Sequence, residues 1–242
     1  MYYDNIFRIE IIVFIIWKLG GQTMREDVLQ AIEREKLIAI VRGIESSACL
    51  KVAQALYEGG VRLLEITYDQ RHPETWELTA QAIGETARTY AGKMLVGAGT
   101  VTSEELVELT HAHGGAFCLA PDTNEAVIRR AVELGMVSIP GALTPTEVMT
   151  AHRAGADFVK LFPAGDFGPG YMKALRAPVS HVKLLAVGGV NEKNIPDFLA
   201  AGAVGVGVGG NLANRAWIEA GEYWKLTEAA RAMTEVIRAA VK

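Results

Sequence analysis

The chain has 242 residues, of which 50% are hydrophobic and 21% are charged, and its formal net charge is −4. This length and hydrophobic content suit one compact domain with a large core, and the lack of a strong positive charge argues against nucleic acid as a partner. Cys49 and Cys118 are the two cysteines. Two thiols make neither a disulfide framework nor a zinc site, which favours a reducing, cytoplasmic location.

The first 23 residues differ from the rest of the chain. Residues 9–17 are apolar apart from Glu10, a run far shorter than the roughly 20 residues of a membrane span. Acidic Asp4 and Glu10 stand where a signal peptide carries basic residues. We therefore expect no membrane partner, an extension outside the fold at residues 1–23, and a single domain at residues 24–242.

From residue 25 onwards, amphipathic helices alternate with short apolar strands. Residues 25–35 predict a short helix, and the apolar run after them predicts a strand that is buried on both faces. A helix that ends in glycine, followed by an apolar strand, then recurs at about twenty residues or twice that spacing, as after Gly135 and Gly155. The predicted strands are 37–42, 63–68, 94–99, 116–119, 137–140, 157–162, 183–187 and 204–208.

Short buried strands that alternate with helices indicate parallel pairing. Eight of them close into a (β/α)8 TIM barrel, here with a short N-terminal helix before the first strand. An open doubly wound sheet is the alternative, but it would not require such even repetition. In a barrel, active sites form at the C-terminal ends of the strands, so the residues found there become candidates for chemistry.

A lysine stands inside one of the apolar strands. Period-two alternation places Lys160 on one face with Phe158 and Phe162, whereas Val159 and Leu161 face the other way. An ammonium group loses hydration in such surroundings, and its pKa falls. The neutral amine can then attack a carbonyl and form a Schiff base. The alternative is a lysine at a strand end whose ammonium group reaches solvent.

Other polar residues and glycines fall at the same predicted end of the barrel. Arg42 ends the first strand, and Glu65 lies within the second on the face of Leu63 and Thr67. A carboxylate, an arginine and a lysine would thus share one opening, although such groups also pair inside barrels merely to neutralise each other. Glycine pairs end the last two strands, where bare N–H groups can form an anion cradle or simply a tight turn.

No cofactor or metal is expected from the sequence. None of the five histidines forms a ligand pair with a nearby carboxylate at metal spacing. No Gly-x-Gly-x-x-Gly motif follows a strand in the context of a dinucleotide site. A metal-dependent mechanism therefore loses support.

Six motifs occur in a fixed order and together cover nearly all of residues 24–214. They are Leu37–Gly43, Gly60–Thr67, Val96–Val101, Ile139–Glu147, Val159–Ala164 and Val187–Asn191. In identity and spacing they resemble the class I aldolases of 2-keto-3-deoxy-6-phosphogluconate (KDPG) and 4-hydroxy-2-oxoglutarate (KHG).

The resemblance implies a lyase of carbohydrate metabolism that cleaves a 2-keto-4-hydroxy acid to pyruvate and an aldehyde, either glyceraldehyde 3-phosphate or glyoxylate. It implies that Lys160 forms the Schiff base and that Glu65 is the general acid and base. It also implies a homotrimer that requires no metal. Finally, it implies that Thr100 and Arg42 bind the pyruvate carboxylate. The substrate-binding residues expected in all are Arg42, Thr100, Pro121, Gly188, Gly189, Gly210 and Asn211.

Two departures from the family pattern bear on the substrate. Many members carry an arginine four residues after the catalytic glutamate, where this chain has Asp69. Many also carry Thr and Ser in the phosphate loops, where this chain has Val187 and Asn211. The sequence motif around Val187 resembles the one in relatives that act on the galactonate epimer. The substrate 2-dehydro-3-deoxy-6-phosphogalactonate is therefore an alternative. A phosphosugar epimerase or thiamine-phosphate-synthase-like barrel and a catalytically silent keto-acid-binding barrel are further alternatives.

Overall fold

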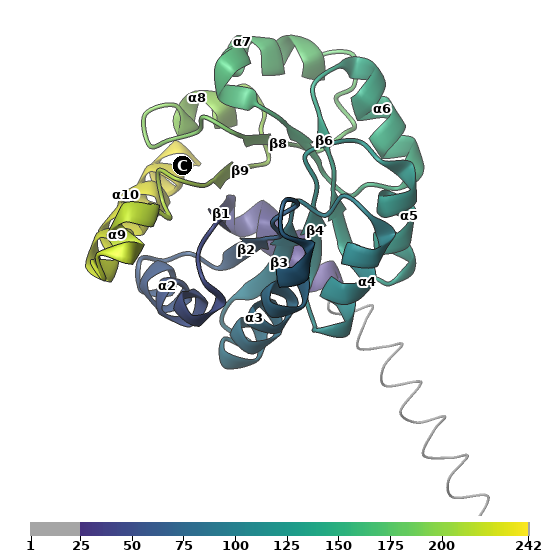
Figure 1. Ribbon diagram of the computed structural model, residues 1–242. Helices are drawn as coiled ribbons and strands as arrows, with labels where there is room; N and C mark the ends of the chain where they lie inside the picture. Colours follow the sequence, from purple (N-terminus) through teal and green to yellow (C-terminus); the bar gives the residue numbers. More distant parts are fainter. Residues whose placement is uncertain (1–24, 242) are drawn as a thin grey trace, which may run out of the picture.

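The computed structural model describes residues 25–241, so the expectation for residues 1–23 lies outside the described residues. Parallel strands form a ring that is surrounded by helices (Figure 1). The strands are β1 (Leu37–Val41), β2 (Leu63–Thr67), β3 (Leu95–Gly99), β4 (Phe117–Leu119), β5 (Val137–Ile139), β6 (Gly141–Ala142), β7 (Val159–Leu161), β8 (Leu184–Val187) and β9 (Gly205–Val208).

A helix at residues 25–35 precedes β1. The later helices are α2 (Ser46–Glu58), α3 (Trp76–Thr89), which follows the short 3₁₀ helix η1 (Pro73–Thr75), α4 (Glu104–Ala112), α5 (Glu125–Glu133), α6 (Pro145–Ala154), α7 (Ala164–Arg176), α8 (Ile195–Ala200), α9 (Arg215–Glu219) and α10 (Tyr223–Ala240). Side chains cap several of them. Thr144, for example, forms a capping box with Glu147 at the start of α6.

The fold confirms the predicted α/β barrel, with one refinement at the fifth predicted strand. Pro140 divides that strand into β5, which pairs with β4, and β6, which pairs with β7. The sheet order β5-β4-β3-β2-β1-β9-β8-β7-β6 therefore begins and ends on neighbouring residues. Since Lys160 N also donates to Pro140 O at 2.9 Å, the ring closes through this proline.

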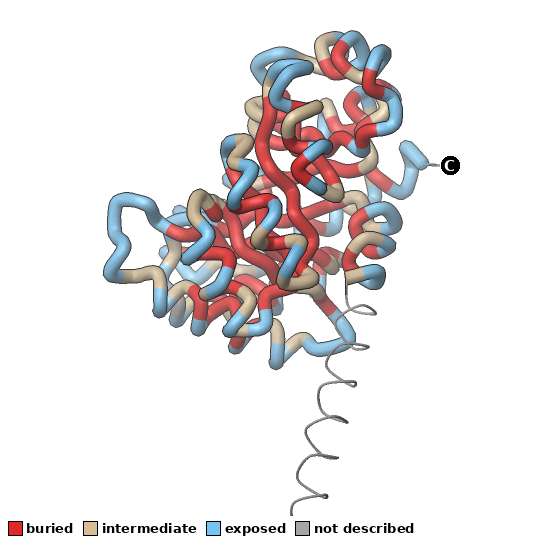
Figure 2. The backbone as a smooth tube through the Cα atoms, turned by 90° about the vertical axis from the view of Figure 1, so that its right-hand side faces the viewer, coloured by how far each residue is buried: buried red, intermediate tan, exposed pale blue. Residues whose placement is uncertain are grey.

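Alternate side chains of the strands belong to two different hydrophobic clusters. Outward residues such as Leu64 and Val159 pack against the helices, whereas inward residues such as Leu63 and Phe158 fill the barrel. This is the alternation expected of strands that are covered on both faces. The buried backbone accordingly runs through the middle of the molecule, and the exposed segments lie outside it (Figure 2).

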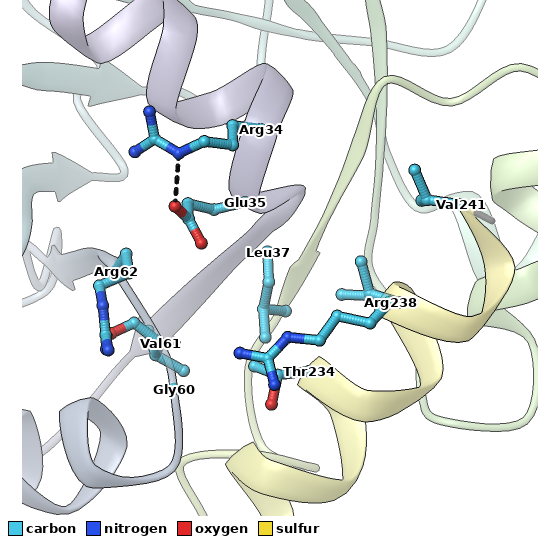
Figure 3. A pocket seen from close by; sticks show the side chains of 10 residues that line it. Arg34, Glu35, Leu37, Gly60, Val61, Arg62, Thr234, Arg238 and Val241 are labelled. Atoms are coloured by element: carbon cyan, nitrogen blue, oxygen red, sulfur yellow. Dashed lines mark hydrogen bonds and ion pairs between the residues drawn. The ribbon is translucent and has the colours of Figure 1, made fainter.

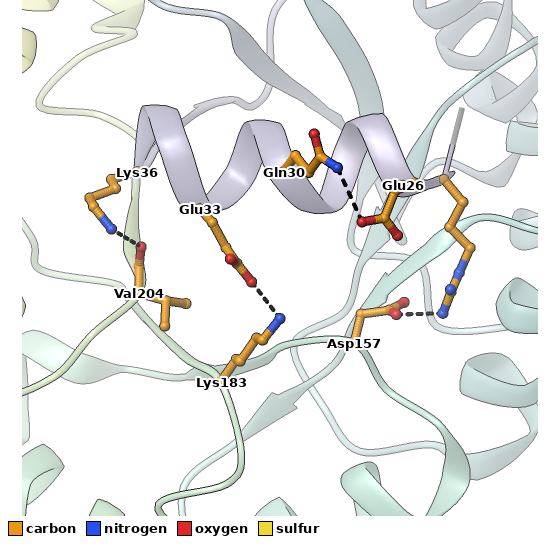
Figure 4. Close-up of polar contacts among 8 residues, drawn as sticks. Glu26, Gln30, Glu33, Lys36, Asp157, Lys183 and Val204 are labelled. Atoms are coloured by element: carbon orange, nitrogen blue, oxygen red, sulfur yellow. Dashed lines mark hydrogen bonds and ion pairs between the residues drawn. The ribbon is translucent and has the colours of Figure 1, made fainter. Parts of the chain in front are cut away.

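The helix at residues 25–35 closes the end of the barrel where the strands begin. Its Val28 and Ile32 belong to the interior cluster. Ion pairs of Arg25 with Asp157 and of Glu33 with Lys183 tie it to the starts of β7 and β8 (Figure 4). The opposite end, where the strands finish, is therefore left for the site. Within residues 25–241, no helix is both long enough and apolar enough to cross a bilayer.

Candidate active site

The predicted site residues lie within or directly after the strands, toward their C-terminal ends. Because all strand pairs are parallel, these ends share one mouth of the barrel. Arg42 follows β1, Glu65 lies in β2, Thr100 follows β3, Pro121 follows β4, Lys160 lies in β7, Gly188 and Gly189 follow β8, and Gly210 and Asn211 follow β9.

Glu65 and Lys160 stand on opposite walls of the barrel interior. When β5 and β6 are taken as one broken strand, β2 and β7 are four places apart in either direction around the ring. Both side chains are buried, with 2% of Glu65 and 5% of Lys160 exposed. A carboxyl group and an amine are therefore both buried inside the barrel, and each acts on the charge of the other.

The neighbours of Glu65 leave one of its oxygens without a partner. Thr67 Oγ1 donates to Glu65 Oε1 at 3.1 Å, and Oε2 is buried without a hydrogen bond to any described residue. A Cβ atom on Gly99 would lie 1.5 Å from Oε1, so only glycine at this position of β3 leaves room for the carboxyl group. Burial raises the pKa of Glu65, and this outweighs the lowering by Lys160, the Thr67 hydrogen bond and Arg42.

Lys160 lies in an apolar part of the interior. Its Nζ is 4.9 Å from the centre of the Phe162 ring. Burial lowers the pKa of the Lys160 ammonium, and Arg42 lowers it further, whereas Glu65 and Asp122 act in the opposite direction. Burial thus favours the neutral amine of Lys160 and the protonated acid of Glu65. Such a pair can attack a carbonyl carbon and deliver a proton to its oxygen.

The loop after β3 holds Thr100 in an unusual backbone conformation. Thr100 has φ +56°, in the left-handed region that residues other than glycine rarely adopt. Gln70, in the loop after β2, donates from Nε2 to Thr100 O at 2.9 Å. Thr102 Oγ1 in turn donates to Gln70 Oε1 at 2.9 Å. Gln70 therefore fastens the loops after β2 and β3 to each other at the mouth of the barrel.

Asp69, which stands where many members of the resembled family have arginine, is used within its own loop. Its Oδ1 accepts a hydrogen bond from the Arg71 N–H at 2.9 Å, and its backbone oxygen accepts one from Trp76 Nε1 at 2.9 Å. The loop after β2 thus provides an amide, Gln70, beside Thr100. Arg42, after β1, is an exposed cation that acts on the charges of both Glu65 and Lys160.

The glycines after β8 form a turn that contacts the start of α7. Gly188 and Gly189 both have positive φ, at +87° and +71°, which favours glycine. Gly165 N, in the first turn of α7, donates to Gly188 O at 2.7 Å. Asn211 Nδ2 donates to Val190 O at 3.1 Å and so joins the loops after β8 and β9.

Sequence reasoning missed Gln70 and Asp122. Both lie in loops, and no local pattern indicates that Gln70 would reach Thr100 or that Asp122 would lie within electrostatic reach of Lys160. Among residues 25–241, no three His, Cys, Asp or Glu side chains gather in a way that could hold a metal ion.

Comparison with known proteins gives consistent matches. The family model described as "KDPG and KHG aldolase" matches residues 28–229. The chain is 40% identical over 177 residues, 73% of its length and 83% of the relative's, to the 2-dehydro-3-deoxy-6-phosphogalactonate aldolase of Escherichia coli K12. It is 33% identical to the KHG/KDPG aldolase of that strain, over 82% of this chain and 89% of the relative. A solved structure titled "Native KDPGal structure" has a TM-score of 0.76 and 36% identity, covering 85% of this chain and 95% of that one.

Proposed function

The chain belongs to the KDPG and KHG aldolase family, and we propose that it cleaves 2-dehydro-3-deoxy-6-phosphogalactonate to pyruvate and glyceraldehyde 3-phosphate through a Schiff base on Lys160. The observation that carries the chemistry is the buried amine of Lys160 opposite the buried carboxyl group of Glu65. The assignment of the galactonate epimer is supported by the 40% identical relative and by Val187 before the glycine pair.

In the proposed mechanism, the amine of Lys160 attacks C2 of the keto acid while Glu65 gives its proton to the carbonyl oxygen. The resulting carbinolamine loses water to form an iminium ion. The C3–C4 bond then breaks, its electron pair moves to the iminium nitrogen, and Glu65, directly or through a water molecule, takes the proton of the C4 hydroxyl group. The aldehyde leaves, the enamine is protonated at C3, and hydrolysis releases pyruvate and restores the amine.

The substrate carboxylate binds at Arg42 and Thr100, and the phosphate at the other side of the mouth. Arg42 offers a planar guanidinium group, which suits a carboxylate. Thr100 follows β3, two strands away from β1 in the ring, on a loop that Gln70 fastens. Gly188, Gly189, Gly210 and Asn211 form the phosphate side, where backbone N–H groups replace the hydroxyl groups that Val187 and Asn211 lack. Pro121 lines the mouth between these two sides.

A direct comparison of substrates tests this assignment. Release of pyruvate, coupled to lactate dehydrogenase, is measured with the phosphorylated galactonate and gluconate epimers and with 4-hydroxy-2-oxoglutarate. The galactonate epimer is expected to give the highest kcat/KM. A higher kcat/KM with the gluconate epimer would move the assignment to that substrate, and no pyruvate from any of the three would reject the aldolase reaction.

Cleavage of the gluconate epimer and of 4-hydroxy-2-oxoglutarate is the second candidate function. It is supported by the 33% identical KHG/KDPG aldolase, whose similarity extends over more of the chain, 201 residues against 177. The homotrimer and the lack of a metal requirement stay predictions, which sedimentation equilibrium and turnover in the presence of EDTA would check.

Replacement of Arg42 and replacement of Glu65 should shift the pKa of Lys160 in opposite directions. Arg42 lowers the pKa of Lys160 and Glu65 raises it, so Arg42→Ala should shift the midpoint upward and Glu65→Gln should shift it downward. In the wild-type protein the midpoint should lie below the ordinary lysine value of 10.5. Nuclear magnetic resonance of ¹³Cε-labelled lysine measures this midpoint without bound substrate. A wild-type midpoint at 10.5, or shifts of the same sign in both variants, would contradict the proposed electrostatics.

Replacement of Gln70 should weaken substrate binding rather than chemistry. Gln70→Leu removes the hydrogen bond that fastens the Thr100 loop, and one such bond contributes about 1 kcal/mol, so we expect KM to rise about five-fold with little change in kcat. Thr102→Val is the matched control, because it removes only the outer hydrogen bond to Gln70 and should have a smaller effect. A fall in kcat at unchanged KM would show that Gln70 does not act through binding.

A further inference from the structure

A separate cavity lies at the end of the barrel where the strands begin, opposite the mouth that holds Lys160. Its volume is about 400 Å³, which is within the range of pockets for small molecules. Three segments that are distant in sequence form its walls: the end of the first helix with the start of β1, the turn before β2, and the last turns of α10 (Figure 3). The residues that line it include Arg34, Glu35, Leu37, Val61, Arg62 and Arg238.

The charge of this cavity is opposite to that of the chain as a whole. Arg34, Arg62 and Arg238 line it together with a single carboxylate, that of Glu35. Three positive groups and one negative group leave a net charge of +2, whereas the whole chain carries −4. Because guanidinium groups stay protonated at every physiological pH, this charge is permanent.

Most of the donors of the three guanidinium groups make no hydrogen bond with residues 25–241. Arg34 donates from Nε to Glu35 Oε1 at 2.8 Å, which leaves its two terminal nitrogens. Arg62 donates from Nη1 to the carbonyl oxygens of Tyr57 and Val61 at 3.0 and 2.8 Å. Its guanidinium group also lies 4.2 Å from the centre of the Tyr57 ring, so it is held in place with Nη2 unused. Arg238 makes no hydrogen bond or ion pair with residues 25–241.

The shape and chemistry of the cavity define the class of ligand. Guanidinium groups bind phosphate and carboxylate oxygens through parallel hydrogen bonds, and two net positive charges match an anion with at least two negative charges. Leu37 and Val61, both buried, provide an apolar wall beside the arginines. We propose that this cavity binds a small, multiply charged oxyanion such as pyrophosphate or a phosphate monoester, at a site separate from the proposed aldolase site.

An anion held there would connect the first helix, the turn before β2 and α10. Since it would bind the folded chain and not the unfolded one, it would raise the melting temperature, and the rise would grow with the logarithm of the anion concentration above Kd. It would also slow amide hydrogen exchange in residues 34–37, 60–62 and 234–241, because these segments would open less often.

The test uses the full chain and inorganic pyrophosphate as the probe. Isothermal titration calorimetry compares the wild-type protein with Arg238→Ala and with the matched control Arg231→Ala, which removes the same charge two turns earlier on α10 and outside this cavity. Arg238→Ala should weaken binding at least about ten-fold, the loss expected for a hydrogen bond between charged groups. Arg231→Ala should bind pyrophosphate as the wild-type protein does.

Hydrogen exchange followed by mass spectrometry locates the bound ion. Protection by pyrophosphate in segments 34–37, 60–62 and 234–241, lost in Arg238→Ala, supports the proposal. No binding to the wild-type protein, equal binding to Arg238→Ala, or protection confined to the loops after β8 and β9 would overturn it. None of these outcomes depends on the aldolase assay, so the two proposals fail or succeed separately.

Discussion

Replacement of Lys160 by methionine is expected to abolish pyruvate release while leaving the barrel folded. The proposed nucleophile is lost, and removal of a nucleophile from a covalent enzyme lowers kcat on the order of 10⁶-fold. Methionine fills a similar volume without an amine, so the apolar surroundings of residue 160, including Phe158 and Phe162, are kept. The measurement is the lactate-dehydrogenase-coupled assay, with circular dichroism as the check of folding.

The matched control is Lys183→Met, the same substitution at the closed end of the barrel. Lys183 pairs with Glu33 on the surface, and its replacement should leave turnover within about two-fold, because a surface ion pair contributes little to stability and lies far from the mouth. Turnover by Lys160→Met above a tenth of the wild-type rate would show that another group forms the covalent intermediate.

Replacement of Glu65 by glutamine is expected to lower kcat by about 10²–10⁴-fold, the usual contribution of a positioned acid and base. Glutamine keeps the shape next to Gly99 and can still accept the hydrogen bond of Thr67, but it cannot exchange a proton with the reacting oxygens. KM should change little, because Arg42 and Thr100 remain. Steady-state kinetics measures both constants, and Glu33→Gln at the closed end serves as the control.

We also expect Glu65→Gln to change how the free energy of unfolding depends on pH. Burial raises the pKa of Glu65 above its ordinary value of 4.5. A raised carboxyl pKa contributes stability that is fully present below pH 4.5 and is lost as the pH rises through the folded-state value. Urea unfolding should therefore find that Glu65→Gln gains stability relative to the wild-type protein as the pH increases above 4.5. A difference that is constant with pH would contradict the raised pKa.

The fold could be predicted because each step of the inference is local. Alternation of period two predicts which side chains of a strand point inward, and a glycine at the end of several helices, as at Gly135 and Gly155, marks the turn to the next strand. The break at Pro140 could not be predicted from local patterns. It depends on how the ring closes, because β5 pairs with β4 whereas β6 pairs with β7. The eight predicted strands are all present, with Pro140 as a break in the fifth.

The site could be predicted only where it lies on strands. The placement of Glu65 and Lys160 inside the barrel follows from strand periodicity, and their roles stay predictions. Gln70 and Asp122 lie in loops, where the position of a side chain depends on the closed ring rather than on its sequence neighbours. The same reason explains the arginine-lined cavity, whose three segments meet only in the folded barrel.

Trapping of the covalent intermediate would show whether Lys160 forms the Schiff base. The protein is incubated with pyruvate, reduced with sodium borohydride, digested and analysed by tandem mass spectrometry. We expect one stable N-(1-carboxyethyl) modification, formed when hydride reduces the iminium carbon, on Lys160 and absent in Lys160→Met. No modification of the wild-type protein, or a modification on a different lysine, would contradict it.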